Sequence, residues 1–102
     1  MTFSAGERIF SQGELGTEMF IIQEGVVEII KHIAGESHLL SRLEKGDFFG
    51  EMAILEALPR TADAVALTDV KVVAINGSRF DEMLRKNPEV AVRIIRKYSK
   101  RL

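Results

Sequence analysis

The chain has 102 residues, 46% of them apolar and 28% charged, with a formal net charge of −1, which is the composition of one soluble globular domain with a modest core. It has no cysteine, so disulfides, thiolate metal sites and cysteine nucleophiles are excluded. It also has no signal peptide and no window near the roughly 18 apolar residues of a membrane-spanning helix, which favours a cytoplasmic location.

Glycines recur every several residues through the first half of the chain, and short apolar runs lie between them. This pattern is typical of an all-β sandwich or barrel. The run 19–22 is apolar at every position, so its strand is expected at the centre of the sandwich. The segment Ala34-Gly35-Glu36-Ser37 is expected to form a hairpin turn. Strands are expected at residues 2–4, 8–11, 18–24, 26–33, 37–43, 47–49, 62–66 and 70–76.

Residues 48–62 follow as a strand end, a short helix and a tight exit, with the sequence Phe-Phe-Gly-Glu-Met-Ala-Ile-Leu-Glu-Ala-Leu-Pro-Arg-Thr-Ala. Gly50 has no Cβ, so a ligand could approach its backbone closely. The helix start behind it presents unpaired N–H groups, which suit a phosphate, and the helix is expected to continue until Pro59 closes it. Arg60 then brings a planar fork of donors that matches phosphate oxygens.

Glu51 is unexpected beside a phosphate, because a carboxylate repels an anion. A carboxylate accepts well, however, from paired hydroxyls such as those of a ribose. Singly, Glu51 could be a helix-start residue and Arg60 a surface residue, but their combination with Gly50 and Pro59 argues against that interpretation. The stretch therefore predicts a small nucleotide pocket, in which a ring-closed, monoanionic phosphate would need one cation and no metal.

The order Phe-Gly-Glu-Met-Ala, then Pro-Arg-Thr-Ala with Glu51 and Arg60 nine apart, resembles the phosphate-binding cassette of the cyclic-nucleotide-binding domain family. Residues 3–13 are similar to the family's opening strands and residues 19–27 to its central hairpin. The resemblance implies a mainly β fold, an eight-stranded antiparallel jelly-roll followed by two C-terminal helices. The whole of 1–102 would be one domain, with the roll at 1–76, its cassette at 48–62 and the helices at 77–102.

The resemblance also implies roles for individual residues. Glu51, helped by the Gly50 backbone, would hold the ribose 2′-hydroxyl, and Arg60 would pair with the cyclic phosphate. Backbone N–H groups of Ala53 and Thr61 would complete the anion site. Ile29 and Leu43 would be apolar contacts to the base, and Thr61 does not decide between cAMP and cGMP. The expected ligand contacts in the cassette are Gly50, Glu51, Met52, Ala53, Arg60, Thr61 and Ala62.

The hydrophobic period changes from two to that of a helix at Asn76. Ser78 is expected to cap a first helix with Phe80, Met83 and Leu84 on one face, and Asn87-Pro88 to start a second. In the second helix an apolar stripe of Val90, Ala91, Ile94, Ile95, Tyr98 and Leu102 is expected opposite a basic face of Arg93, Arg96, Lys97, Lys100 and Arg101. Because the stripe is still running at Leu102, we expect a module of a larger protein or a helix that pairs with a partner.

Residues 79–102 hold eight Lys or Arg against three Asp or Glu, a balance that can serve nucleic acid or anionic lipid. The segment lacks interleaved aromatic residues and a DNA-reading motif, so a solvated helix face is favoured and no direct nucleic-acid binding is expected. His32 and His38 flank the predicted hairpin turn without a third ligand, which argues against a metal site.

The sequence therefore predicts a non-catalytic sensor module that binds a cyclic nucleotide, cAMP in preference to cGMP, and signals by moving its terminal helices. No cofactor is expected besides that ligand. The other expected partners are an effector or parent domain, contacted through the helices, and a second copy of the chain. The alternative is a ligand-free jelly-roll that serves interaction or oligomerisation.

Overall fold

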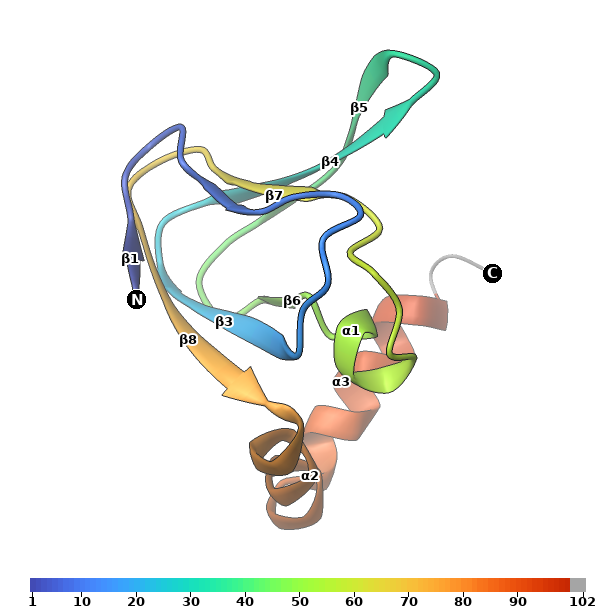
Figure 1. Cartoon of the computed structure of the whole chain (residues 1–102). Coiled ribbons are helices and arrows are strands. Elements are labelled where there is room, and N and C mark those ends of the chain that lie inside the picture. Colours follow the sequence, from blue (N-terminus) through green and yellow to red (C-terminus); the bar gives the residue numbers. More distant parts are fainter. Residues whose placement is uncertain (100–102) are drawn as a thin grey trace.

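The computed structural model describes residues 1–99 of the chain, with side chains up to residue 97 (Figure 1). Within them, eight strands form two antiparallel sheets, and three helices gather at one end of the roll. The predicted mainly β roll with two C-terminal helices is therefore confirmed. The strands are β1 (Thr2–Phe3), β2 (Arg8–Phe10), β3 (Glu18–Glu24), β4 (Val27–Ile33), β5 (Glu36–Leu43), β6 (Phe48–Phe49), β7 (Asp63–Ala66) and β8 (Val70–Asn76), and the helices are α1 (Met52–Leu55), α2 (Gly77–Lys86) and α3 (Pro88–Ser99).

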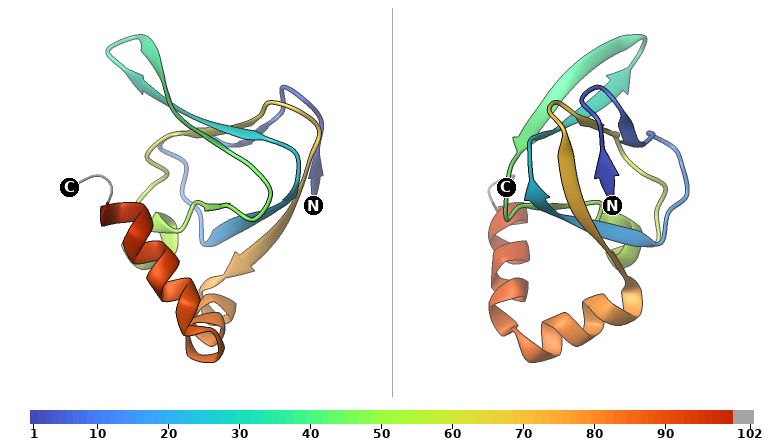
Figure 2. Two further views of the ribbon diagram at one scale, coloured as in Figure 1. Left: turned by 180° about the vertical axis from the view of Figure 1, so that it is seen from behind. Right: turned by 90° about the vertical axis from the view of Figure 1, so that its left-hand side faces the viewer.

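The two sheets have the strand orders β1-β8-β3-β6 and β2-β7-β4-β5. In the second sheet β4 and β5 pair along their whole length, and their outer part projects from the roll as a two-stranded ribbon (Figure 2). Ala34 and Gly35 at its tip both have positive φ, 51° and 82°, as the two central residues of a type I′ hairpin turn require. The predicted hairpin turn is therefore confirmed, although β5 begins at Glu36, one residue earlier than expected.

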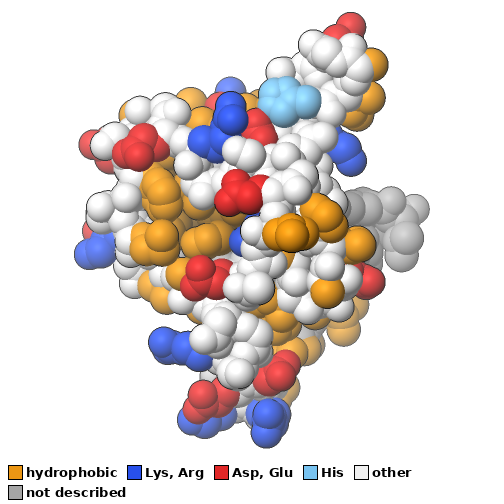
Figure 3. All heavy atoms as spheres, in the orientation of Figure 1, with side chains coloured by type: hydrophobic (Ala, Val, Ile, Leu, Met, Phe, Trp, Pro, Cys, Tyr) orange, Lys and Arg blue, Asp and Glu red, His pale blue; other side chains and the backbone are white. Residues whose placement is uncertain are grey.

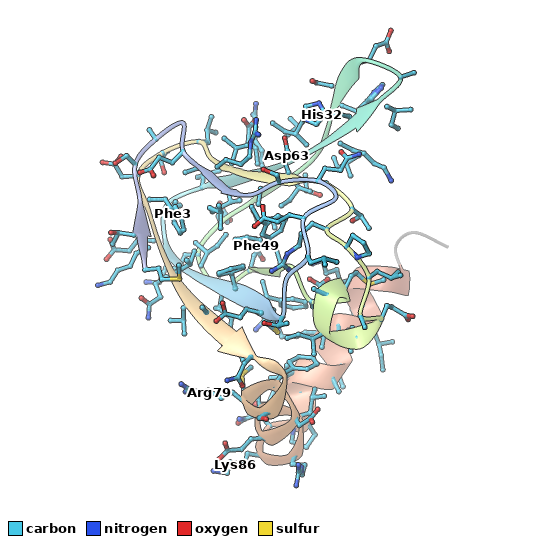
Figure 4. The ribbon with its side chains drawn as sticks, viewed as in Figure 1. Phe3, His32, Phe49, Asp63, Arg79 and Lys86 are labelled. Atoms are coloured by element: carbon cyan, nitrogen blue, oxygen red, sulfur yellow. The ribbon has the colours of Figure 1, made fainter. Side chains whose placement is uncertain are left out.

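The main core lies between the sheets and is centred on three phenylalanine rings. Phe49 lies 5.3 Å from Phe20 and 5.8 Å from Phe10, measured between ring centroids. These rings come from β6, β3 and β2, so they join both sheets, and the burial of such large apolar groups dominates core energetics. The position of Phe49 inside the roll is visible in Figure 4.

A second cluster of buried side chains joins the roll to its helices. Met19 of β3 meets Phe48, Ile75 and Phe80 there, while its neighbour Phe20 belongs to the main core. Because β3 contributes side chains to a cluster on each face, its run of apolar residues is explained, and the predicted central position is confirmed. Partly buried residues of α2 and α3 complete this cluster, namely Met83, Leu84 and Ile94.

The cassette helix α1 is about one turn long and ends well before the proline. It ends at Leu55, with Glu56 as its C-cap and Ala57 in the left-handed conformation at φ 52°. A left-handed residue just after the last turn stops a helix. The expectation that Pro59 ends the helix is therefore wrong, since the chain has already left it.

The start of α2 also differs from the prediction. Asn76, not Ser78, is its N-cap, because the Asn76 Oδ1 accepts a hydrogen bond from the backbone N–H of Arg79 at 2.9 Å. Ser78 lies in the first turn of the helix. At the other end, Asn87 is the C-cap of α2. Pro88 is the first residue of α3, as predicted. None of the described helices is both long and apolar enough to cross a bilayer.

The orientation of α3 corrects the predicted apolar stripe. Ile94 packs against the second cluster, but Ile95 is 66% exposed, so it does not belong to the buried face. Arg93 and Lys97, expected on the solvated side, face the roll instead and donate to backbone carbonyl oxygens there. Long basic side chains can bury their aliphatic stems while their charged ends reach such acceptors. The side chain of Tyr98 and residues 100–102, which include the remainder of the stripe, lie outside the described part of the chain.

Candidate functional site, a charged cavity beside α1

A cavity of about 80 Å³ lies beside α1, between the cassette and the inner face of the roll. Its walls come from β2, β4, β6 and α1 and from the segment that leads into β7. All seven expected cassette contacts meet at this one cavity, and so does Ile29. The lining residues are Phe10, Ile29, Phe49, Gly50, Glu51, Met52, Ala53, Pro59, Arg60, Thr61 and Ala62.

Leu43, the other expected base contact, lies elsewhere. It faces Val27 in the β4–β5 register, whereas Ile29 faces Ser41, so the two apolar residues are not side by side. Leu43 lines a separate hollow beneath α3, which it shares with Asp47, Phe48, Arg93, Arg96 and Lys97. The structure thus distributes the two expected base contacts between two neighbouring hollows.

Arg60 is the cation of the site, and it is only 8% exposed. Its guanidinium carbon lies 4.2 Å from the centroid of the Phe10 ring, and its Nη1 donates to the carbonyl oxygen of Gly50 at 2.9 Å. Burial lowers the pKa of Arg60 from its ordinary value, and nearby carboxylates, of which Glu14 is the strongest, oppose that change. An arginine keeps its proton in proteins, so the cavity holds a fixed positive charge.

Two glycines leave room for this guanidinium. A Cβ at Gly16, in the loop before β3, would collide with the guanidinium group, and a Cβ at Gly50 would lie 2.8 Å from the Arg60 Nη1. Gly50 also has φ 81°, a conformation that side chains rarely allow. The sequence singled out Gly50 but treated Gly16 only as a break between strands, and no local pattern links Gly16 to an arginine 44 positions later.

Glu51 is the carboxylate of the site, and it is 3% exposed. It occupies the N-cap position of α1, but its side chain does not cap that helix. Its Oε1 accepts from the Nζ of Lys97 at 2.7 Å, a distance typical of a charge-assisted hydrogen bond. A buried carboxylate needs such a partner, because an unpaired charge in the interior is costly.

Lys97 is the functional residue that sequence reasoning missed. Its Nζ also donates to the carbonyl oxygen of Phe48 at 3.0 Å and lies 4.5 Å from the centroid of that ring. Lys97 follows Glu51 by 46 positions, so the pair exists only through the packing of α3 against the roll. No spacing rule within a helix or strand could have indicated it.

The chemistry that these groups can support is narrow. A guanidinium can bind one anionic group, and a carboxylate on the same cavity can accept from hydroxyls. Among the described residues, no three His, Asp or Glu side chains are placed to hold a metal ion together. The arrangement therefore suits a small molecule that carries a single phosphate and free hydroxyls.

A second polar network lies at the root of the β4–β5 ribbon, just beyond the cavity. Asp63 begins β7, is 4% exposed, and accepts from the backbone N–H of Gln12 at 2.6 Å. Its other oxygen lies 2.7 Å from the Nε2 of His32, and the two side chains approach each other in Figure 4. The Gln12 side chain bonds to both backbone groups of His32. This network ties the ribbon to the loop before β3, so His32 has a structural role.

Replacing Asp63 by asparagine should lower the free energy of unfolding at pH 7 by about 2 kcal/mol, because hydrogen bonds to a charged group contribute about 1.5–3 kcal/mol. Burial alone would raise the pKa of Asp63, but the Gln12 N–H, His32 and the charge of Arg8 bring it below its ordinary 3.8. The native state therefore holds this proton less tightly than the unfolded chain, so the stabilisation is complete above pH 3.8 and is lost as the pH falls through the lower native value. Urea unfolding at several pH values would measure this. The same acid dependence in the wild type and in Asp63→Asn would contradict it.

Comparison with known proteins places this geometry in context. The family model described as cyclic nucleotide-binding domain matches residues 1–87. The cAMP-dependent protein kinase regulatory subunit of Eremothecium gossypii is 35% identical over 88 residues, which cover 86% of this chain and 19% of that protein. The crystal structure of Thermus thermophilus catabolite activator protein has a TM-score of 0.88 at 30% identity, over 99% of this chain and 48% of that one.

A third relative carries a different description. The regulatory subunit of a cAMP-independent protein kinase A from Trypanosoma brucei has a TM-score of 0.80 at 30% identity, over 92% of this chain and 35% of that one. The chain thus spans less than half the length of each of these three proteins.

Proposed function

The chain belongs to the cyclic nucleotide-binding domain family, and we propose that it is a regulatory sensor that binds a cyclic nucleotide in the cavity beside α1. The observation that carries this proposal is the burial of Glu51 and Arg60 on the walls of one cavity. Arg60 would bind the ring-closed phosphate and Glu51 the ribose 2′-hydroxyl. A buried cation and a buried carboxylate are expensive to maintain in a small domain, which favours a functional use for both.

We infer that cAMP is the preferred nucleotide, because the kinase regulatory subunit among the relatives is described as cAMP-dependent. The proposed role is regulatory and non-enzymatic, and its proposed location is the cytoplasm. Gly50, Met52, Ala53, Thr61 and Ala62 are the proposed remaining contacts in the cassette, since they line the same cavity. Ile29 is proposed to touch the base from this cavity and Leu43 from the hollow beneath α3.

Occupancy of the cavity is proposed to reach the rest of a regulator through α2 and α3. Phe48 is the first residue of the cassette and lies in one apolar cluster with Phe80 of α2 and Ile94 of α3. A shift of the cassette would therefore change the packing of both helices. The nucleotide can bias this equilibrium only by as much as it prefers one arrangement over the other. An effector domain or a second copy of the chain would then bind differently to the two positions of the helices.

Thermal unfolding with added nucleotides is the experiment that tests the proposal. A ligand that binds only the folded state at 100 times its Kd stabilises it by about 2.7 kcal/mol. For a domain of this size each kcal/mol raises the Tm by about 4–8 °C, so saturating cAMP should raise it by roughly 10 °C or more. We expect a smaller shift with cGMP and almost none with 5′-AMP, which has the same base but an open phosphate. No shift with either cyclic nucleotide would contradict the proposal.

A second candidate function is a roll that acts as an interaction module without a cyclic nucleotide. One structural relative is described as part of a cAMP-independent kinase, although its fold is similar. Ile33, Leu39 and Leu40 are each about half exposed on the β4–β5 ribbon, where apolar side chains gather at the projecting end (Figure 3). Exposed apolar patches are frequent at protein interfaces. This candidate predicts an unchanged Tm with both nucleotides, so the same measurement decides between the two functions.

A further inference from the structure

Both charged groups of the cavity have partners within the chain. The Nη1 of Arg60 donates to the Gly50 carbonyl oxygen at 2.9 Å, and the Oε1 of Glu51 accepts from the Nζ of Lys97 at 2.7 Å. Lys97 belongs to α3, whereas Glu51 precedes α1. The carboxylate proposed to hold the ribose is therefore bonded to the helix proposed to carry the signal.

Two side chains of the basic face of α3 are bonded to the chain at and just before the start of the cassette. Arg93 and Lys97 are four residues apart, so they project from the same side of the helix. Arg93 donates to the carbonyl oxygen of Gly46 at 2.6 Å, and Lys97 donates to that of Phe48 at 3.0 Å. Gly46 and Phe48 offer neutral acceptors, but Glu51 offers a negative charge. The Lys97–Glu51 pair is thus an ionic attachment between α3 and the wall of the cavity.

The Glu51 carboxylate is too deeply buried for a ribose to reach it without a rearrangement of this wall. The Glu51 side chain is 4% exposed and that of Lys97 25% exposed. The volume of about 80 Å³ is well below the roughly 300–1,000 Å³ of typical small-molecule pockets. A ribose can reach the Glu51 carboxylate only when the surroundings of that carboxylate rearrange, and Lys97 is in direct contact with it.

We propose that Lys97 is an internal competitor for Glu51, which a cyclic nucleotide displaces when its 2′-hydroxyl takes the carboxylate. This inference rests on the proposed function. The phosphate contact to Arg60, which is charge-assisted, compensates for the exchange of an ammonium for a neutral hydroxyl at Glu51. Once displaced, Lys97 no longer fastens α3 to the cavity wall. Because the two equilibria are linked, the binding free energy that cAMP loses to competition by Lys97 equals the free energy by which cAMP favours the detached state of α3.

Three variants test this competition by titration with fluorescent cAMP. Lys97→Met removes the ammonium and keeps the aliphatic stem, while Lys97→Arg keeps a cation. Lys86→Met is the matched control, because Lys86 also forms an ion pair, with Glu82 at 2.7 Å on α2. Lys86 lies at the end of α2 that points away from the roll in Figure 4. We expect Lys97→Met to bind at least about threefold more tightly than the wild type, the scale of a partly exposed ion pair. Lys97→Arg should return towards wild-type affinity, and Lys86→Met should equal it.

Hydrogen exchange of the α3 amides provides a readout that a purely structural role of Lys97 would not reproduce. Without nucleotide, these amides should exchange faster in Lys97→Met than in the wild type, and cAMP should accelerate them in the wild type. Slower exchange of wild-type α3 with cAMP would overturn the inference. Lys97→Gln, which keeps a neutral donor, must also bind cAMP more tightly than the wild type. It replaces Lys97→Met if Lys97→Met does not fold.

The outcomes separate this inference from the proposed function. If the wild type binds cAMP and Lys97→Met binds it equally or more weakly, that result would overturn the competition but leave the proposed nucleotide site standing. Weaker binding would instead make Lys97 a residue that positions Glu51 for the ribose, and equal binding would give it no role in nucleotide affinity. If the wild type binds neither cAMP nor cGMP, the proposed function fails and the competition fails with it.

Discussion

Arg60→Ala is expected to weaken the binding of cAMP by at least tenfold. A charge-assisted hydrogen bond contributes about 1.5–3 kcal/mol, and about 1.4 kcal/mol corresponds to a factor of ten. Arg60 is 8% exposed and its guanidinium lies next to Phe10 and the Gly50 carbonyl, so it would meet the phosphate in a poorly hydrated place. Titration of wild type and variant with fluorescent cAMP measures the effect.

Two further arginine variants make this comparison specific. Arg60→Lys keeps the charge but loses the planar fork, so it should bind with intermediate affinity. Arg79→Ala removes an exposed arginine on α2, far from the cavity in Figure 4, and should leave affinity unchanged. The Tm of each variant without nucleotide separates lost binding from lost folding. Equal affinity of Arg60→Ala and wild type would remove Arg60 from the site.

Glu51→Gln is expected to abolish most of the preference for a ribose 2′-hydroxyl. The wild type should bind 2′-deoxy-cAMP about tenfold or more weakly than cAMP, because the hydroxyl donates to a buried carboxylate. In Glu51→Gln we expect the two ligands to differ by less than about threefold, since a neutral amide oxygen is a weaker acceptor. Titration of both ligands into both proteins forms a complete cycle.

The substitution has a second effect, because Glu51→Gln also removes the ionic partner of Lys97. By the competition proposed above, cAMP displaces Lys97 from Glu51 and 2′-deoxy-cAMP does not. The ratio between the two ligands therefore reports the ribose contact less the cost of displacing Lys97. An undiminished preference for the hydroxyl in Glu51→Gln would mean that another group reads the ribose.

The strands of the roll could be predicted from sequence because each is bounded by glycine or polar turn residues. Both ends of each of the eight strands lie within one residue of the predicted positions, including those of the two-residue β6. Glycines at the turns take the positive φ that the sharp reversals need, for example Gly13 and Gly46. In this chain the turn residues and the apolar pattern of the strands indicate the same boundaries, and prediction from local sequence succeeds when such signals agree.

The helices were harder to predict because tertiary contacts decide their ends and faces. Ala57 stops α1 in a left-handed conformation that non-glycine residues seldom adopt. Asn76 and Ser78 are both good capping residues, and β8 extends to Asn76, which leaves Asn76 as the cap. The face of α3 that meets the roll depends on acceptors in β6 and in the loop before it, so the periodicity of α3 did not reveal that face.

The candidate site likewise has residues that local sequence could predict and residues that only tertiary packing brings in. Its cassette residues are nearly contiguous in sequence, so a short helix and a tight exit suffice to bring Glu51 and Arg60 to one cavity. Gly16 and Lys97 join them from distant segments through packing that no local pattern encodes. Leu43 was placed by resemblance, and its register opposite Val27 puts it in the neighbouring hollow.

A crystal structure of the chain with cAMP is the most direct test of the two-residue site. We predict the cyclic phosphate within hydrogen-bonding distance of the Arg60 guanidinium, and the ribose 2′-hydroxyl on the Glu51 carboxylate in place of Lys97. A nucleotide bound elsewhere, with Arg60 on the Gly50 carbonyl and Glu51 paired with Lys97 as they are now, would contradict the assignment.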